Sequence, residues 1–285
     1  MGKIARSWDL LGQSFRVLKA DKELMWLPVL SAIFCVFVTT QVFFWGVLLY
    51  YPSITENMAR HARWKPSPEF LCTLSFLLYF LNYSVISYFN TALVGAATVR
   101  LQGGDPTLED GLRVAWRRKG VILQWALVAA TVGMVLKMIE DRASFIGKLV
   151  AGMIGLAWTL ASFLVVPILA FEDVGPIEAL RRSSELFRKT WGEQVSGGVS
   201  FGIIFFFLTI PGALFPIAGN AIAGRAGLLG GLAVLVVYIL LLSVVSSATH
   251  GIFVAALYRY ATTGEVPPGF QKYDFSTAWR ARNSW

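Results

Sequence analysis

The sequence predicts an all-α membrane protein, a polytopic bundle of six transmembrane helices with amphipathic helices at the cytoplasmic interface. Of its 285 residues 56% are hydrophobic and 15% charged, and the mean hydropathy of +0.61 lies above that of soluble domains. Several apolar runs reach the roughly 20 residues that a helix needs to cross a bilayer. Helices are expected because lipid offers no partners for backbone N–H and C=O groups. A recurring pattern of amphipathic helix and apolar span also predicts a three-fold internal repeat.

An amphipathic helix opens the chain, over residues 2–20. Its apolar side chains recur at spacings of four and three, with charged residues elsewhere on the helical wheel. Two interpretations stay open, because such a helix either lies flat in the membrane interface or packs across the end of the bundle. The first span is predicted over residues 24–51, with Pro28 in its first turn, where a missing N–H costs little. A polar connection over residues 52–67 follows.

The second span, predicted over residues 68–100, carries a polar stripe. At 100° per residue, seven small or polar residues share one sector, whereas Asn82 points the other way. Such a stripe should face protein and not lipid. It serves either for hydrogen bonds between helices or as the wall of a hydrated cavity. The stripe comprises Tyr83, Ser84, Ser87, Asn90, Thr91, Gly95 and Thr98.

A glycine-rich turn, residues 103–106, separates this span from a short amphipathic helix. Thr107 and Asp110 stand three residues apart at its start, which predicts a capping box with Asp in place of the usual Glu or Gln. The helix ends in the basic run of residues 117–119, at the edge of the next apolar span. Basic residues in this place are typical of contact with anionic lipid headgroups, and they do not indicate nucleic-acid binding.

The third and fourth spans are predicted over residues 120–138 and 144–171. Small residues form a stripe along the fourth span, which favours close approach of another helix. Pro167, near the end of this span, predicts a kink because proline lacks the N–H and clashes with the preceding turn. A second Gly-Pro turn and a second amphipathic run, residues 177–191, then copy the earlier pattern.

The fifth and sixth spans are predicted over residues 195–218 and 228–260, joined by a flexible glycine-rich turn. Serines of the sixth span share one sector with His250. Imidazole titrates near neutral pH, and ionisable groups inside a membrane are functional candidates. The alternative is a neutral histidine hydrogen-bonded to a neighbour. The tail, residues 263–285, looks like a degenerate third amphipathic segment.

One membrane domain is therefore expected over residues 1–285, with repeats over about residues 1–100, 101–172 and 173–262. We expect the second, fourth and sixth spans, which end the repeats, to meet centrally and to turn their polar groups toward one another. The candidate polar core comprises Tyr83, Ser87, Asn90, Thr91, Ser246, Ser247 and His250.

Charge predicts the orientation. With six spans, both termini and the amphipathic segments share one side, and that side holds 18 of the 25 lysines and arginines. The excess places it in the cytoplasm and places the protein in the inner (cytoplasmic) membrane of a cell. Membrane lipids, with anionic headgroups at the cytoplasmic face, are the expected partners. The sequence leaves the oligomeric state and any protein partner open.

The residue patterns do not indicate an enzyme. The sequence contains no GxSxG elbow, Walker loop, HExxH or CxxC, and it has only two histidines. We therefore expect no enzyme, no cofactor and no metal. The leading hypothesis is a non-enzymatic protein that organises or scaffolds the membrane, and the alternative is a transporter or channel for a small solute or lipid.

The N-terminal motifs resemble those of a known family. Ser7-Trp-Asp-Leu-Leu-Gly-Gln-Ser-Phe-Arg16, followed by Asp21-Lys-Glu-Leu-Met-Trp-Leu-Pro-Val-Leu-Ser31, resembles the opening of an uncharacterised bacterial family of six-helix integral membrane proteins. The helix-then-span repeats are similar to those of the membrane domain of some glycerophosphodiester phosphodiesterases. The resemblance implies architecture and location, and it carries no catalytic or binding residue to this chain.

Overall fold

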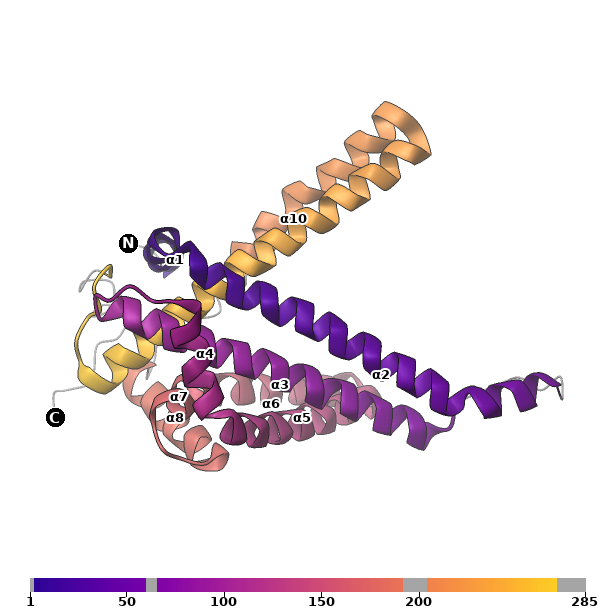
Figure 1. The fold of residues 1–285 in the computed structure, drawn as a ribbon, viewed down its shortest axis with the longest axis horizontal. Coiled ribbons are helices and arrows are strands. Elements are labelled where there is room, and N and C mark those ends of the chain that lie inside the picture. Colours follow the sequence, from indigo (N-terminus) through magenta and orange to yellow (C-terminus); the bar gives the residue numbers. More distant parts are fainter. Residues whose placement is uncertain (1–2, 60–65, 192–203, 271–285) are drawn as a thin grey trace.

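The computed structural model describes residues 3–59, 66–191 and 204–270, and every regular element in those residues is helical (Figure 1). The all-helical prediction is confirmed. Five of the described helical runs are long and apolar enough, by length and composition, to cross a membrane. They are Lys22–Tyr50, Pro68–Leu101, Lys119–Arg142, Phe145–Phe171 and Ile204–Thr263. The last run contains 60 residues and doubles back on itself, so six crossings and the three-fold repeat stay predictions.

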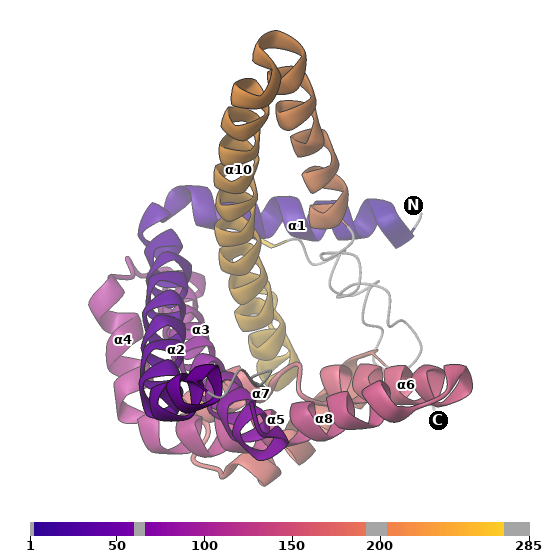
Figure 2. The same cartoon turned by 90° about the vertical axis from the view of Figure 1, so that its right-hand side faces the viewer.

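Helix α1 (Lys3–Ala20) runs across the base of the last hairpin, where it contacts α10 (Leu214–Thr263) (Figure 2). Leu10 and Leu18 are buried, whereas Phe15 remains exposed. The structure thus favours the packing interpretation of this helix. The exposed ring of Phe15 is available for contact with lipid.

The short helix η1 (Lys22–Met25) leads into α2 (Trp26–Ala59). Helix α2 contacts α3 (Pro68–Leu101), and these two form the first pair of long helices. The predicted first span, residues 24–51, agrees with the membrane-length run Lys22–Tyr50. Helix α2 itself continues to Ala59, so the first part of the predicted polar connection is helical. Residues 53–65 contain neither glycine nor proline, so the polar composition alone does not stop the helix. Helix α3 begins as predicted, with the Ser67 hydroxyl accepting a hydrogen bond from the backbone N–H of Phe70.

The amphipathic helix α4 (Leu108–Arg117) lies against α3. The predicted capping box is present: the Thr107 hydroxyl accepts from the N–H of Asp110, whose carboxylate accepts from the N–H of Thr107. Gly111 permits a close approach, because a Cβ there would lie 2.4 Å from the carbonyl oxygen of Ala92. This contact holds the polar helix against the end of an apolar one.

The second hairpin contains α5 (Lys119–Arg142) and α6 (Phe145–Ala161). The fourth predicted span breaks at residues 162–164, after which α7 (Val165–Phe171) continues. The predicted kink at Pro167 is confirmed. The break lies about four residues before Pro167 because the proline ring would clash with the carbonyl group of the residue four positions earlier in a regular helix. The N–H of Leu164, freed by the break, donates to the Ser183 hydroxyl of α8 (Pro176–Trp191) at 3.0 Å.

The last apolar run forms a hairpin. Its first arm passes through a short 3-10 helix, η2 (Ile210–Ala213), into α10. The chain reverses at Ala223 and Gly224, where Gly224 takes a φ of 57° that favours glycine. This reversal lies within the predicted turn. The two arms rise away from the other helices in both views (Figures 1 and 2).

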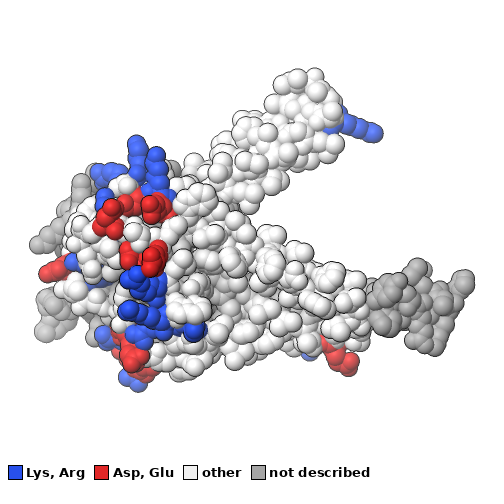
Figure 3. Space-filling model, viewed as in Figure 1, with Lys and Arg blue, Asp and Glu red and all other residues white. Residues whose placement is uncertain are grey.

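The buried core lies at the end of the molecule where charged side chains gather, around α1, α4 and α8 (Figure 3). Here α3 contacts α7 and α10, and α7 contacts α10, so the second and sixth spans meet the fourth span at its end, in α7. They meet through apolar side chains: Leu93, Ile168 and Phe253 are 1%, 0% and 0% exposed. The opposite halves of the long helices carry mostly apolar surface.

Candidate functional site

The polar stripe of α3 is largely bonded within its own helix. Ser87 and Thr91 are buried, while Tyr83 and Asn90 are half-buried. The Thr91 hydroxyl donates to the Ser87 carbonyl at 2.8 Å, and Ser84 donates to Phe80 in the same way. Hydroxyls bonded to the carbonyl four residues earlier need no partner on another helix. The stripe thus packs against protein without forming a shared polar network.

The predicted polar residues of α10 lie less deeply than expected. Ser246 and Ser247 are half-buried, and His250 is exposed with its ring edge-on to Phe163 at a centroid distance of 5.7 Å. Within the described part of the chain, neither serine forms a hydrogen bond with the stripe of α3. The proposed polar cluster is therefore not assembled by direct hydrogen bonds between these serines and α3.

Sequence reasoning missed one buried polar residue, Thr249, and it did not identify the partner of Asn82. Thr249 is fully buried on α10 and donates to the Val245 carbonyl at 2.6 Å. Its position three residues after Ser246 is a helical-face spacing that could have revealed it. On the other side of α3, Asn82 donates to the Thr39 hydroxyl of α2 at 3.1 Å. The prediction that Asn82 points away from the stripe is confirmed, and its partner is Thr39.

A pocket of about 880 Å³ lies between α3, α5 and α6. Its size falls in the range of small-molecule sites. Tyr83 is the one residue of the predicted polar core that lines it. Further polar side chains around the pocket are Ser75, Tyr79, Lys137, Glu140, Asp141, Thr159 and Ser162.

The two ends of this pocket differ in chemistry. At the loop between α5 and α6, Lys137 Nζ lies 3.0 Å from Asp141 Oδ1 and 3.9 Å from Glu140 Oε2. At the inner end, Trp158 lines the pocket and stacks on buried Trp125, with ring centroids 5.7 Å apart. A charged rim and an aromatic floor give the pocket an amphiphilic character.

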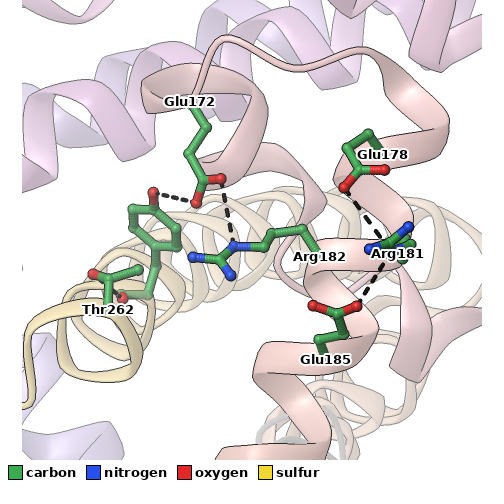
Figure 4. A network of polar contacts seen from close by, with 7 residues as sticks. Glu172, Glu178, Arg181, Arg182, Glu185 and Thr262 are labelled. Carbon is green, nitrogen blue, oxygen red and sulfur yellow. Dashed lines mark hydrogen bonds and ion pairs between the residues drawn. The ribbon is translucent and has the colours of Figure 1, made fainter.

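A second polar region joins the helices at the charged end (Figure 4). Tyr258 of α10 donates to Glu172 Oε1 at 3.0 Å, and Arg182 of α8 lies 3.5 Å from Glu172 Oε2. Arg259 donates to the carbonyl of Leu101, the last residue of α3, at 2.8 Å. These contacts tie the ends of α3, α7 and α10 to one another, so this network has a structural explanation.

Two carboxyl groups at the charged end have shifted pKa values. Burial raises the pKa of Asp21, and the Arg100 guanidinium, whose Nε lies 2.8 Å from Asp21 Oδ2, opposes that shift. Hydrogen bonds from the Thr107 hydroxyl and backbone N–H lower the pKa of half-buried Asp110. Both pKa shifts arise in the segments that connect helices. Neither carboxyl group lines the pocket.

Across the described ranges, no group of three or more His, Cys, Asp or Glu side chains is placed to hold a metal ion. The acidic side chains mentioned above instead contact arginine, lysine, threonine or tyrosine.

Long apolar helices, charged groups gathered at one end and an amphiphilic pocket between the helices define a helical membrane protein. Within that class, the chain belongs to DUF6159, a family of unknown function whose sequence model matches residues 70–269. No curated protein matches the chain. The likeness to the membrane domain of glycerophosphodiester phosphodiesterases stays a prediction.

Proposed function

We propose that the protein is a non-enzymatic organiser of the bacterial inner membrane, with six crossings and both termini in the cytoplasm. In this proposal the charged end faces the cytoplasm, where α1, α4 and α8 lie at the level of anionic headgroups. Trp116 of α4 is exposed, and Lys119 Nζ lies 3.6 Å from its ring centroid. An exposed aromatic ring with an adjacent cation suits the headgroup layer.

The observation that carries this proposal is the apolar junction of α3, α7 and α10. Leu93, Ile168 and Phe253 fill it, and the nearby Thr91 and Thr249 hydroxyls donate to their own helices. A path for ions or polar solutes needs groups that replace water along its length. A dry junction tied at its surface by Tyr258 and Arg259 instead suits a rigid platform for interfacial helices.

Cysteine accessibility tests both the dry junction and the orientation. In a variant with Cys35 and Cys72 replaced by serine, single cysteines are introduced at Thr91, Arg113 and Ser144. A membrane-impermeant thiol reagent is then added to everted and to right-side-out inner-membrane vesicles. We expect Arg113→Cys to react only from the cytoplasmic side, Ser144→Cys only from the other side, and Thr91→Cys from neither. Labelling of Thr91→Cys in folded protein would contradict the dry junction, and the reverse pattern at the other two positions would contradict the orientation.

A second candidate function, transport of a small solute or lipid, is favoured by the pocket between α3, α5 and α6. Transport requires the pocket to exchange its contents with the cytoplasmic side. Proteoliposomes that carry a fluorescent phospholipid in one leaflet measure that exchange by quenching from outside. Faster exchange in the presence of the protein, lost when the pocket is filled by mutation, would favour transport over the organising function.

A further inference from the structure

We propose that the pocket between α3, α5 and α6 holds one phospholipid whose headgroup carries both a phosphate and a primary ammonium, as in phosphatidylethanolamine. The inference rests on the pocket and does not require transport, since a stably bound lipid can equally serve as part of a platform. It assigns the ligand from three properties: the depth of the pocket, the chemistry of its walls and the charges at its rim.

The depth of the pocket matches one leaflet of a bilayer. Its lining residues extend along α5 from Ala129 to Asp141 and along α3 from Leu71 to Tyr83. Twelve residues of helix rise roughly 18 Å, at about 1.5 Å per residue. The hydrocarbon core of a bilayer is about 30 Å thick, so one leaflet contributes about half of that. An acyl chain that enters beside a headgroup at the rim therefore ends near the floor of the pocket.

The inner walls suit an acyl chain better than a polar solute. Thr159 donates to the Gly155 carbonyl at 2.9 Å, and Ser162 donates to the Thr159 carbonyl at 3.3 Å. Tyr79 packs on Gly133, where an added Cβ would lie 2.8 Å from the tyrosine hydroxyl. Hydroxyls that already donate to their own helix offer little to a buried polar ligand, whose unpaired groups would be costly. The aromatic face of Trp158 completes an apolar floor.

The rim presents both signs of charge within about one helical turn. Lys137 is placed to contact a phosphate, while Glu140 and Asp141 are placed to accept hydrogen bonds from an ammonium group. Arg142 follows directly, so residues 137–142 carry two positive and two negative side chains. A segment without net charge does not favour an anionic headgroup, whereas paired opposite charges complement a zwitterionic one. All three rim side chains are more than half exposed and accessible to a headgroup.

Photolabelling of the full-length protein tests the site. The protein is reconstituted in phosphatidylcholine vesicles that contain a trace of phosphatidylethanolamine with a photoreactive acyl chain, and labelled peptides are identified after digestion. We expect label to concentrate on α3, α5 and α6 and to be displaced by unlabelled phosphatidylethanolamine more effectively than by phosphatidylglycerol. Label spread evenly over all apolar helices would overturn the proposal, because it would indicate ordinary bilayer contact. Equal displacement by phosphatidylglycerol would overturn the assignment of the headgroup.

A space-filling substitution provides the matched variant. A Cβ at Gly155 meets open space, so Gly155→Leu should project into the pocket without displacing backbone. We expect it to lower labelling about tenfold, which corresponds to the loss of roughly two methylene contacts. Gly230→Leu is the control, because Gly230 is exposed on α10 and also meets open space. Gly152→Leu repeats the test at a second pocket position, and unchanged labelling in both pocket variants would overturn the proposal.

The rim is tested separately. The double variant Glu140→Gln and Asp141→Asn should abolish the preference for phosphatidylethanolamine while leaving the acyl chain bound. Glu178→Gln with Glu185→Gln is the control, since these carboxylates flank Arg181 on α8 in a similar arrangement outside the pocket (Figure 4). A preference that survives in the rim variant would overturn the assignment of the ammonium to these carboxylates.

Discussion

Tyr258 and Glu172 are 86 residues apart in the sequence, and the tyrosine hydroxyl donates to the glutamate carboxylate at 3.0 Å. The bond joins the end of α10 to the end of α7, while Arg182 of α8 approaches the other oxygen of the same carboxylate. One glutamate therefore connects the end of α7 to both α10 and α8. Together with the bond from Arg259 to Leu101, it fixes the relative positions of the three helix ends that form the apolar junction.

Removal of this hydroxyl should destabilise the junction. In Tyr258→Phe, Glu172 loses a neutral donor and retains Arg182, so we expect the free energy of unfolding to fall by about 1 to 2 kcal/mol. Unfolding in mixed micelles with increasing SDS measures the change. Tyr88→Phe is the control, because within the described structure the Tyr88 hydroxyl has no hydrogen-bond partner. Equal effects of the two substitutions would show that the Tyr258 bond does not stabilise the fold.

Gly111 tests how α4 is held against α3. In Gly111→Ala the new methyl group would lie 2.4 Å from the Ala92 carbonyl oxygen, a backbone atom that cannot move aside cheaply. We expect a loss of about 1 to 3 kcal/mol in the same unfolding assay, as for other overpacked positions. Gly120→Ala meets open space and should be neutral or slightly stabilising, because alanine is the better helix former. Similar stability of both variants would contradict the close contact.

Much of the helical architecture was predictable from local signals. Helix α3 was predicted over residues 68–100 and extends over Pro68–Leu101, because a serine cap, an early proline and a glycine turn mark its ends. The capping box of α4 was likewise predictable from the spacing of Thr107 and Asp110. The end of α2 was not predictable in the same way. A change to polar composition marks the edge of the hydrocarbon layer, whereas the helix itself extends beyond that edge to Ala59.

The candidate site was less predictable, and the reason is physical. Helical periodicity correctly grouped Ser87 and Thr91 on one face, and both are buried. It could not show that the Thr91 hydroxyl would bond its own helix, since that choice depends on what the neighbouring helix offers. The pocket was missed because Tyr79, Lys137 and Trp158 come from three helices, and no sequence spacing relates them.

Asp21 predicts a pH dependence of stability. Because burial raises its pKa in the folded protein, the folded state binds this proton more tightly than the unfolded state does. Its contribution is therefore most favourable below the ordinary carboxyl pKa of about 3.9, and it diminishes as pH rises through the raised value. We expect Asp21→Asn to match the wild type at low pH and to be more stable at neutral pH. Unfolding of both proteins across this pH range measures the difference.

Glu69→Gln is the control for that experiment, since Glu69 is an exposed carboxyl at the opposite end of α3 from Arg100, the partner of Asp21. It should leave the pH profile close to that of the wild type. A lower stability of Asp21→Asn at neutral pH would mean that the ion pair with Arg100, at 2.8 Å, outweighs the cost of burying the carboxylate.

The crossing of α3 and α10 can be tested by a disulfide. A Cβ at Gly251 would lie 3.8 Å from the Cβ of Leu93, close to the mean Cβ separation of about 3.8 Å in disulfides. Leu93→Cys combined with Gly251→Cys, with Cys35 and Cys72 replaced by serine, should therefore form an intramolecular bond on mild oxidation. A protease site inserted near Gly175 makes the bond visible, since the two halves stay joined on a gel until the disulfide is reduced.

The pair Leu93→Cys and Gly230→Cys is the control. Its two halves should separate under the same conditions, because Gly230 lies in the protruding hairpin. If the Gly251 pair also separates in folded protein, the convergence of these helices is disproved, and the dry junction on which the proposed organising function rests is disproved with it.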